Sequence, residues 1–233
     1  MFTFKQFAVC QDRCAMKVGT DGVLLGAWAK VEECSRVLDV GTGTGLIALM
    51  AAQRSAADIM AIDLDGDAVE QARENVAASP WKQRIRVMAM DMREMMLAER
   101  DEPFDALLCN PPFFENSLKC PDAARTMARH TDTLSFDQLA RSAARLLAPH
   151  GELSVVIPYD RAADMTVSAA CHGLFVTRKT LVYGVEGARP KRVLMAFARE
   201  ASRCITDTLT IRDSAHQYTS EYIRLVSPFY LKM

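Results

Sequence analysis

The chain has 233 residues, 50% of them hydrophobic and 24% charged, with a formal net charge of −1. This length supports one sizeable hydrophobic core, and the composition is that of a globular protein rather than a disordered chain. The near-neutral charge excludes a polycation, although a local basic patch would suffice to bind nucleic acid. No apolar run reaches the roughly 18 residues of a membrane-spanning helix, and the N-terminus lacks the apolar segment of a secretion signal.

Seven cysteines are scattered along the chain, and no two of them form a C-x-x-C pair. The nearest two, Cys10 and Cys14, have no second pair or histidine cluster that would complete a tetrahedral site. We therefore expect no metal and no disulfide framework. Free thiols indicate a reducing compartment, so we expect a cytoplasmic protein.

Helical and strand patterns alternate along most of the chain. A short helix is expected at 23–29, with Thr20 and Asp21 as its N-cap residues. From residue 36 onward, short apolar runs alternate with segments of helical spacing. The runs predict strands at 36–40, 58–64, 85–90, 104–109 and 153–158, and the segments between them predict helices at 46–54, 67–79, 136–147 and 161–172.

The pattern changes near the C-terminus. Strand-like runs at 175–183 and 192–198 are joined by a polar loop without a helix, which predicts an antiparallel hairpin. The stretch 204–233 indicates one more strand and a short helix. Strand–helix alternation followed by a hairpin predicts a doubly wound α/β fold with a mostly parallel sheet and helices on both faces. Because no linker interrupts the pattern, we expect one domain over 1–233, with a short N-terminal extension at 1–30 and a core at 31–233.

A glycine-rich turn follows the first strand of the core and opens a helix. Gly41, Gly43 and Gly45 would let the backbone approach a ligand closely, and ligands of open α/β sheets bind at the carboxyl ends of the strands. Asp63 ends the next strand, where a carboxylate can accept hydrogen bonds from ribose hydroxyls. On these features alone, NAD and S-adenosylmethionine are both candidates.

Two details favour S-adenosylmethionine. Leu46 stands where the dinucleotide fingerprint G-x-G-x-x-G needs its third small residue. Asp39 lies two residues before the first glycine, where it could reach the ammonium group of the methionine moiety, which NAD lacks. The stretch VLDVGTGTG resembles the class I S-adenosylmethionine-dependent methyltransferases.

That resemblance implies roles for further residues. In the family, this turn binds methionine, the acid at Asp63 holds the ribose, and Asp91 and the backbone of Met92 contact the adenine. Leu64 and Asn110 are included among the candidate cofactor-binding residues. The resemblance also implies a seven-stranded sheet in the order 3-2-1-4-5-7-6 with strand 7 antiparallel, which agrees with the terminal hairpin.

The most specific motif is Asn110-Pro111-Pro112-Phe113, after the fourth core strand. An exocyclic amine is a poor nucleophile because its lone pair is conjugated into the ring. Two acceptors, the side-chain oxygen of Asn110 and the carbonyl of Pro111, would stabilise the positive charge that grows on nitrogen as it attacks a methyl group. The proline pair makes the turn rigid, and Phe113 offers a stacking face. The motif resembles the (D/N)PP(Y/F/W) signature of amino-methyltransferases, which act on adenine N6, cytosine N4, guanine N2 or a glutamine amide.

The substrate is suggested only by a closer resemblance. The N-terminal FKQFAVCQDRCAMKVGTDGVLLGAWA, FDALLCNPPFF, PKRVLMAF and the closing FYLKM are similar to the bacterial tRNA(Val) adenine-N6 methyltransferases. This similarity implies N6-methyladenosine formation beside the anticodon, with Lys17 and Thr20 closing over the methionine end of the cofactor. Phe113 stands where many relatives carry Tyr, which keeps the stacking face and removes a hydroxyl contact.

Basic residues supply local support for RNA binding. They lie after the catalytic turn and around the terminal hairpin, where they could hold phosphates on either side of an inserted base. An anticodon-loop base is already unpaired, which eases its insertion. The alternative is that these residues are solvated surface charges. The candidates are Arg125, Arg129, His130, Arg178, Lys179, Arg189, Lys191 and Arg192.

Other functions remain open at this stage. The nearest are methylation of a release-factor glutamine or of guanine N2 in ribosomal RNA. Different classes are an NAD-dependent oxidoreductase and a catalytically idle RNA-binding factor. We expect a monomeric tRNA N-methyltransferase that uses S-adenosylmethionine and needs neither a metal nor a membrane.

Overall fold

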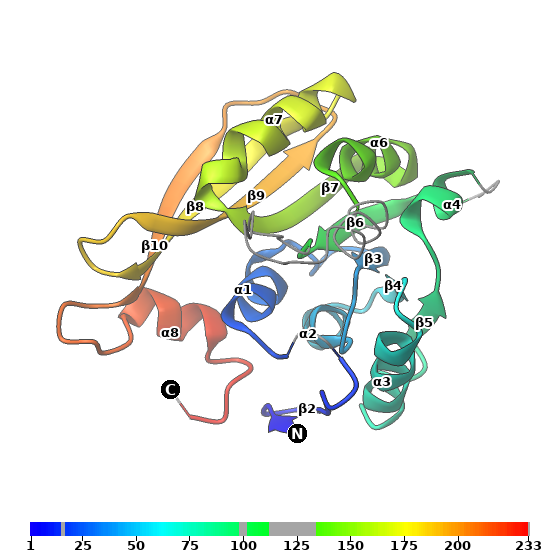
Figure 1. Cartoon of the computed structure of the whole chain (residues 1–233), viewed down its shortest axis with the longest axis horizontal. Helices are drawn as coiled ribbons and strands as arrows, with labels where there is room; N and C mark the ends of the chain where they lie inside the picture. Colours follow the sequence, from blue (N-terminus) through cyan, green and yellow to red (C-terminus); the bar gives the residue numbers. More distant parts are fainter. Residues whose placement is uncertain (15–16, 98–101, 112–133, 233) are drawn as a thin grey trace, which may run out of the picture.

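The computed structural model describes residues 1–14, 17–97, 102–111 and 134–232. Eight of the described strands form a central sheet with the order β10-β8-β9-β7-β6-β3-β4-β5. The strands are β3 (Arg36–Val40), β4 (Asp58–Asp63), β5 (Ile85–Ala89), β6 (Phe104–Cys109), β7 (Leu147–Pro158), β8 (Phe175–Val185), β9 (Pro190–Ala198) and β10 (Ile205–Arg212). Helices cover both faces of this sheet (Figure 1), so the α/β architecture expected from the sequence is confirmed.

The helices divide into two layers. One hydrophobic cluster lies under α1 (Thr20–Trp28), α2 (Leu46–Arg54), α3 (Gly66–Ala77) and α8 (Ser220–Val226). The other lies under α4 (Met92–Leu97), α6 (Phe136–Leu146) and α7 (Ala162–Cys171). In Figure 1, α6 and α7 lie above the sheet, whereas α1, α2 and α8 lie below it. In the described part of the chain, no helix is long and apolar enough to cross a membrane.

The strand order agrees with the expected topology and extends it. Strands β5-β4-β3-β6-β7-β9-β8 reproduce the order 3-2-1-4-5-7-6, and β9 is antiparallel to both of its neighbours. The seven strands implied by the family resemblance are one too few, because β10, the further strand expected within 204–233, pairs in parallel with β8 and adds an eighth strand at the edge. Its Leu209 is buried in the same cluster as Val182 of β8, so the core extends beneath this last strand.

Local interactions explain where the elements begin and end. The predicted bounds of β3, α2 and β6 are confirmed residue for residue. Strand β7 begins at Leu147, earlier than expected, and contains Pro149 and Gly151. The register shifts between Phe104 and Ala106 where β6 pairs with β7, which accommodates the proline. A Cβ on Gly151 would lie 2.8 Å from the carbonyl oxygen of Phe104, so only glycine allows this close approach.

Helix α1 begins earlier than expected and is capped differently. Its N-cap is Gly19, without a side-chain cap hydrogen bond, and Thr20 is the first helical residue. The predicted capping role of Thr20 and Asp21 is therefore wrong. The carboxylate of Asp21 instead accepts a hydrogen bond from Arg192, which is 171 residues away in the chain.

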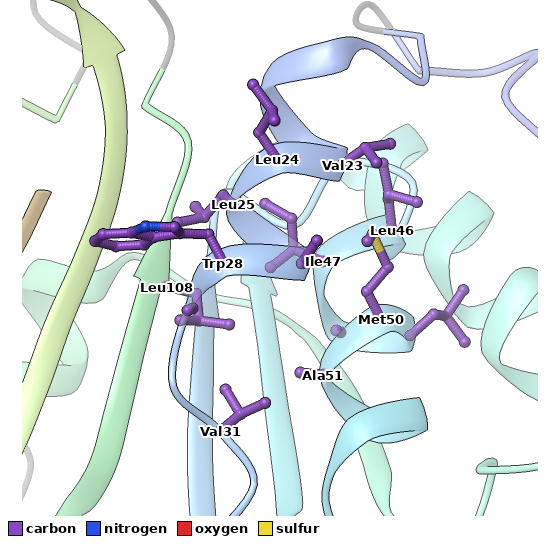
Figure 2. Packing of buried hydrophobic residues seen from close by; sticks show 14 of the residues in the cluster. Val23, Leu24, Leu25, Trp28, Val31, Leu46, Ile47, Met50, Ala51 and Leu108 are labelled. Atoms are coloured by element: carbon purple, nitrogen blue, oxygen red, sulfur yellow. The ribbon is translucent and has the colours of Figure 1, made fainter. Parts of the chain in front are cut away.

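Helix α1 is almost entirely enclosed, with residues Gly22 to Trp28 all buried. Figure 2 shows its apolar side chains against those of α2, with Met50 among them. A Cβ on Gly26 would lie 2.7 Å from Met50 Sδ and 3.0 Å from Met50 Cβ. Glycine at this position therefore fixes how closely α1 approaches α2.

The two ends of the chain meet on the same side of the molecule. The N-terminal hairpin of β1 (Phe2–Thr3) and β2 (Ala8–Val9) is bridged to the C-terminal segment by Phe4 and Tyr230. The following segment is bound to α3, because Asn75 both accepts from Cys10 N and donates to Cys10 O at 2.8 Å. These contacts lead the chain across α3 toward the carboxyl edge of the sheet before α1 begins.

The close approach of α1 to α2 predicts a stability effect. Gly26→Ala should lower the free energy of unfolding by about 1–2 kcal/mol, because overpacking outweighs the better helix propensity of alanine. The matched control is Gly66→Ala, at a helical glycine whose added Cβ would meet nothing within 4 Å. Thermal melts of the three chains measure the effect, and equal melting temperatures for the two variants would contradict this packing constraint.

Candidate active site

Strand register brings three motifs to one edge of the sheet. Val40 of β3 pairs with Ile62 of β4 on one side and with Cys109 of β6 on the other. The residues that follow them, Gly41, Asp63 and Asn110, therefore leave the sheet side by side. Ligands of open α/β sheets bind at this carboxyl edge.

The glycine-rich turn adopts a conformation that requires glycine. Gly41, Gly43 and Gly45 have φ angles of 69°, 54° and 81°, in the left-handed region that other residues rarely enter. Gly43 N donates to Asp63 Oδ2 at 2.8 Å, and Gly41 N donates to Ile62 O at 2.9 Å. A Cβ on Gly41 or Gly43 would meet nothing within 4 Å. The backbone of the turn therefore borders open space on the side where a ligand would lie.

Asp39 anchors this turn from below. Its side chain is fully buried, and Oδ2 accepts from Thr42 Oγ1 at 2.5 Å and from Ala48 N at 3.1 Å. Among the described residues, its Oδ1 has no hydrogen-bond partner. Burial raises the pKa of Asp39 to about 7, although the hydrogen bonds from Thr42 and Ala48 oppose this shift.

A cavity of about 360 Å³ lies over the turn, within the usual size range of small-molecule sites. Most of the residues predicted from the sequence line it: Lys17, Gly41, Gly43, Asp63, Leu64, Asp91, Met92, Asn110 and Pro111. Three predicted cofactor residues are not among its lining residues. Thr20 begins α1, Asp39 lies beneath the turn, and Gly45 packs against α3, where an added Cβ would be 3.5 Å from Ala72 Cβ.

The cavity also has lining residues that the sequence did not reveal, among them Cys14, Gly22 and Arg93. Arg93 binds Asp91 through Nε at 2.8 Å and Nη2 at 2.5 Å, and its backbone N donates to the other carboxylate oxygen at 2.7 Å. These hydrogen bonds hold the pKa of Asp91 below its ordinary value. Only the position of Arg93, two residues after Asp91 at the start of a helix, could have indicated this interaction from the sequence.

Asn110 presents an unpaired acceptor at the cavity. Its Oδ1 is buried and has no hydrogen-bond partner among the described residues. Buried polar atoms are rarely left unpaired, and a ligand is one common explanation. Pro111 is buried beside it and also lines the cavity. Pro112 and Phe113 lie outside the described residues.

The basic residues predicted to bind RNA fall into different environments. Arg189 and Lys191 are exposed at the β8–β9 turn, and Arg192 pairs in register with Pro158 at the carboxyl end of β7. This places them at the same edge of the sheet as the cavity. Lys179 pairs with Met195, further from that edge. Arg125, Arg129 and His130 lie outside the described residues.

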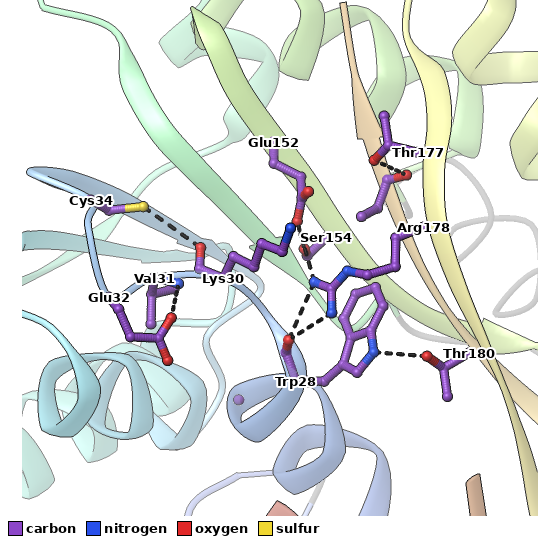
Figure 3. A network of polar contacts seen from close by, with 12 residues as sticks. Trp28, Lys30, Val31, Glu32, Cys34, Glu152, Ser154, Thr177, Arg178 and Thr180 are labelled. Atoms are coloured by element: carbon purple, nitrogen blue, oxygen red, sulfur yellow. Dashed lines mark hydrogen bonds and ion pairs between the residues drawn. The ribbon is translucent and has the colours of Figure 1, made fainter. Parts of the chain in front are cut away.

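Arg178 is not a surface cation, which corrects its grouping with the phosphate-binding candidates. Its guanidinium carbon lies 3.5 Å from the ring centroid of Trp28, and both Nη atoms donate to Trp28 O at 3.3 Å. Figure 3 shows it between Trp28 and Glu152, in contact with the C-terminal end of α1. Arg178 therefore holds α1 against the sheet.

Comparison with known proteins defines the class of this chain. The sequence profile of the family described as "Methyltransferase small domain" matches residues 18–183. That range contains the glycine-rich turn, Asp63, Asp91 and Asn110. The chain belongs to this methyltransferase family.

Relatives that match the whole chain indicate a narrower family. A protein of Phocaeicola vulgatus named tRNA1(Val) (adenine(37)-N6)-methyltransferase is 53% identical over 100% of this chain and 98% of its own. Its namesake in Bacteroides fragilis is 48% identical with the same coverage. At this similarity, the chain belongs to the same family as these proteins.

Solved structures agree on the fold. A predicted O-methyltransferase from Agrobacterium tumefaciens superposes with a TM-score of 0.65 at 21% identity, covering 90% of this chain and 96% of the other. A putative RNA methyltransferase from Pyrococcus horikoshii gives a TM-score of 0.54 at 16% identity, covering 77% of this chain and 82% of the other.

Within the described part of the chain, no group of three His, Cys, Asp or Glu residues is arranged to hold a metal ion.

The buried Asp39 predicts a pH dependence of stability. Its pKa is raised from 3.8 to about 7 in the folded chain, so the folded chain binds more protons than the unfolded chain between these values. The contribution of Asp39 to the free energy of unfolding is therefore present at low pH and lost as the pH rises toward 7. Asp39→Asn should gain stability relative to the original chain as the pH rises. Melting temperatures of both chains at about pH 5 and about pH 8 measure this, and a constant difference would contradict it.

Proposed function

We propose that this methyltransferase transfers a methyl group from S-adenosylmethionine to N6 of an adenine in tRNA, adenine 37 of tRNA1(Val). The observation that carries the reaction type is the buried, unpaired Oδ1 of Asn110 beside the glycine-rich turn. The substrate is supported by the names of relatives that match the whole chain at about half identity. The cytoplasmic location and the monomeric state expected from the sequence remain predictions.

The residues that line the cavity offer hydrogen-bond donors and acceptors suited to S-adenosylmethionine. Gly41 and Gly43 leave room above the backbone for the methionine moiety, with Lys17 on the cavity wall near its carboxylate. Asp63 can accept from the ribose hydroxyls, and Asp91 from the adenine amine, because each carboxylate oxygen has more than one lone pair. Asp39 supports the turn through Thr42 and Ala48 and acts indirectly. The segment 1–30 contributes Cys14, Lys17 and Gly22 to the cavity wall and closes over the cofactor.

When bound, S-adenosylmethionine supplies a methyl group on a positively charged sulfur. The adenine amine is a weak nucleophile, since its lone pair is delocalised into the ring. Asn110 Oδ1 and the carbonyl of Pro111 would accept its two N–H groups and stabilise the positive charge on nitrogen as the methyl group passes from sulfur to N6. S-adenosylhomocysteine would be the leaving group, and the methylated amine would lose one proton to water. Pro112 and Phe113 would keep the turn rigid and give the base a stacking face.

The RNA would be held at the rim of the cavity. Arg189 and Lys191 are exposed at the carboxyl edge of the sheet, where they can neutralise backbone phosphates on one side of the target base. Arg125 and Arg129 would act on the other side. Lys179 lies further from the edge, so its predicted role is the weakest of this group.

The direct test is methyl transfer from labelled S-adenosylmethionine to tRNA from a strain that lacks the gene. The digested nucleosides are then analysed by mass spectrometry. We expect a new N6-methyladenosine peak that maps to the anticodon loop of one tRNA. Labelling of release-factor glutamine or of ribosomal RNA guanine in the same assay, with no labelled tRNA, would contradict the proposed substrate.

Asn110→Ala tests the catalytic role. We expect turnover to fall by about 100-fold or more, because an acceptor that acts mainly in the transition state is lost. Binding of S-adenosylhomocysteine, measured by calorimetry, should stay within about twofold of the original value. Unchanged turnover with folded protein would remove Asn110 from the mechanism.

A further inference from the structure

Helix α1 is attached to the β8–β9 hairpin at both of its ends. At the C-terminal end the attachment is enclosed: Trp28 Nε1 donates to Thr180 Oγ1 at 2.9 Å, and Arg178 stacks on the Trp28 ring (Figure 3). The side chains of Arg178 and Glu152, which form an ion pair at 3.6 Å, are only 16% and 19% exposed. Because this contact is shielded from water, it holds the end of α1 firmly on the sheet.

At the N-terminal end, an ion pair between Asp21 and Arg192 joins the first turn of α1 to the hairpin. Arg192 Nε donates to Asp21 Oδ2 at 2.8 Å, and the two side chains are 34% and 27% exposed. Arg192 also donates through Nη1 to Lys191 O at 3.2 Å. Because these side chains are more exposed than those of Arg178 and Glu152, water screens this ion pair more and it holds α1 less strongly than the Trp28 contact does.

The two partners of this ion pair belong to different parts of the site. Asp21 precedes Gly22, which lines the cavity. A Cβ on Gly22 would lie 3.2 Å from Leu46 Cδ2, so this turn of α1 rests on the first residue after the glycine-rich turn. Arg192 follows the exposed Lys191 at the rim. The ion pair therefore connects the wall of the cofactor cavity with the basic edge of the hairpin.

We propose that the Asp21–Arg192 ion pair is a positioning contact through which RNA at the hairpin and ligand in the cavity strengthen each other's binding. The inference rests on the proposed function. RNA phosphates at Arg189 and Lys191 fix the hairpin end, which keeps Arg192 on Asp21 and the first turn of α1 against the cavity. By linkage, a ligand that orders this turn tightens RNA binding by the same factor.

The test measures the dissociation constant of S-adenosylhomocysteine by calorimetry, with and without a saturating unmodified tRNA transcript. In the original chain, we expect the tRNA to tighten binding by about fivefold or more, as is typical of coupled sites. In Asp21→Asn and in Arg192→Gln, this factor should fall to near one. The double variant Asp21→Arg with Arg192→Asp restores opposite charges and should recover part of it.

A control separates this role from general stability. Arg36→Gln removes an ion pair with Glu102 of 2.7 Å at the amino end of β3, on the opposite edge of the sheet, and should leave the coupling factor unchanged. Circular dichroism shows that each variant is folded. A tRNA effect that persists in both single variants, or is absent from the original chain while N6-methyladenosine still forms, would overturn the positioning role. Failure of the original chain to bind S-adenosylhomocysteine at all would instead remove the proposed function.

Discussion

The parallel pairing of β3 with β4 and β6 is the constraint on which the site depends. This register sets Val40 beside Ile62 and Cys109, so the chain must leave three neighbouring strands at the same height. The glycine-rich turn, Asp63 and Asn110 are far apart in the sequence and meet only for this reason. Helices pack on both faces of the sheet, and we propose that the chemistry occurs at its carboxyl edge.

Two buried oxygen atoms near this edge lower the stability of the chain when no ligand is bound. Among the described residues, Asp39 Oδ1 and Asn110 Oδ1 lack hydrogen-bond partners, and each such atom costs stability when it is kept from water. The two differ in position, because Asn110 lines the cavity and Asp39 lies beneath the turn. Asn110 would recover its missing bond from the substrate amine. Burial of the Asp39 carboxylate raises its pKa. The same carboxylate holds the turn by accepting hydrogen bonds from Thr42 and Ala48.

The sequence predicted the parts of the molecule that depend on local patterns. The strand 36–40 and the helix 46–54 were found at their true bounds, since apolar periodicity and glycines determine them. Contacts between distant residues could not be seen in this way. Asp21 was predicted as a helix cap from its position just before a helical pattern. Its actual partner, Arg192, is 171 residues away, so a local pattern could not reveal this ion pair. Arg178 was grouped with surface cations because nothing in the sequence indicated that Trp28 would cover it.

A structure determined with S-adenosylhomocysteine tests the central claim most directly. The account predicts the homocysteine part over the backbone of Gly41 and Gly43, the ribose hydroxyls on Asp63 and the adenine beside Asp91. Asn110 Oδ1 should remain unpaired and face the sulfur side of the ligand. A ligand bound away from the glycine-rich turn, or one whose sulfur is separated from Asn110 by other side chains, would contradict the assignment of this edge as the active site.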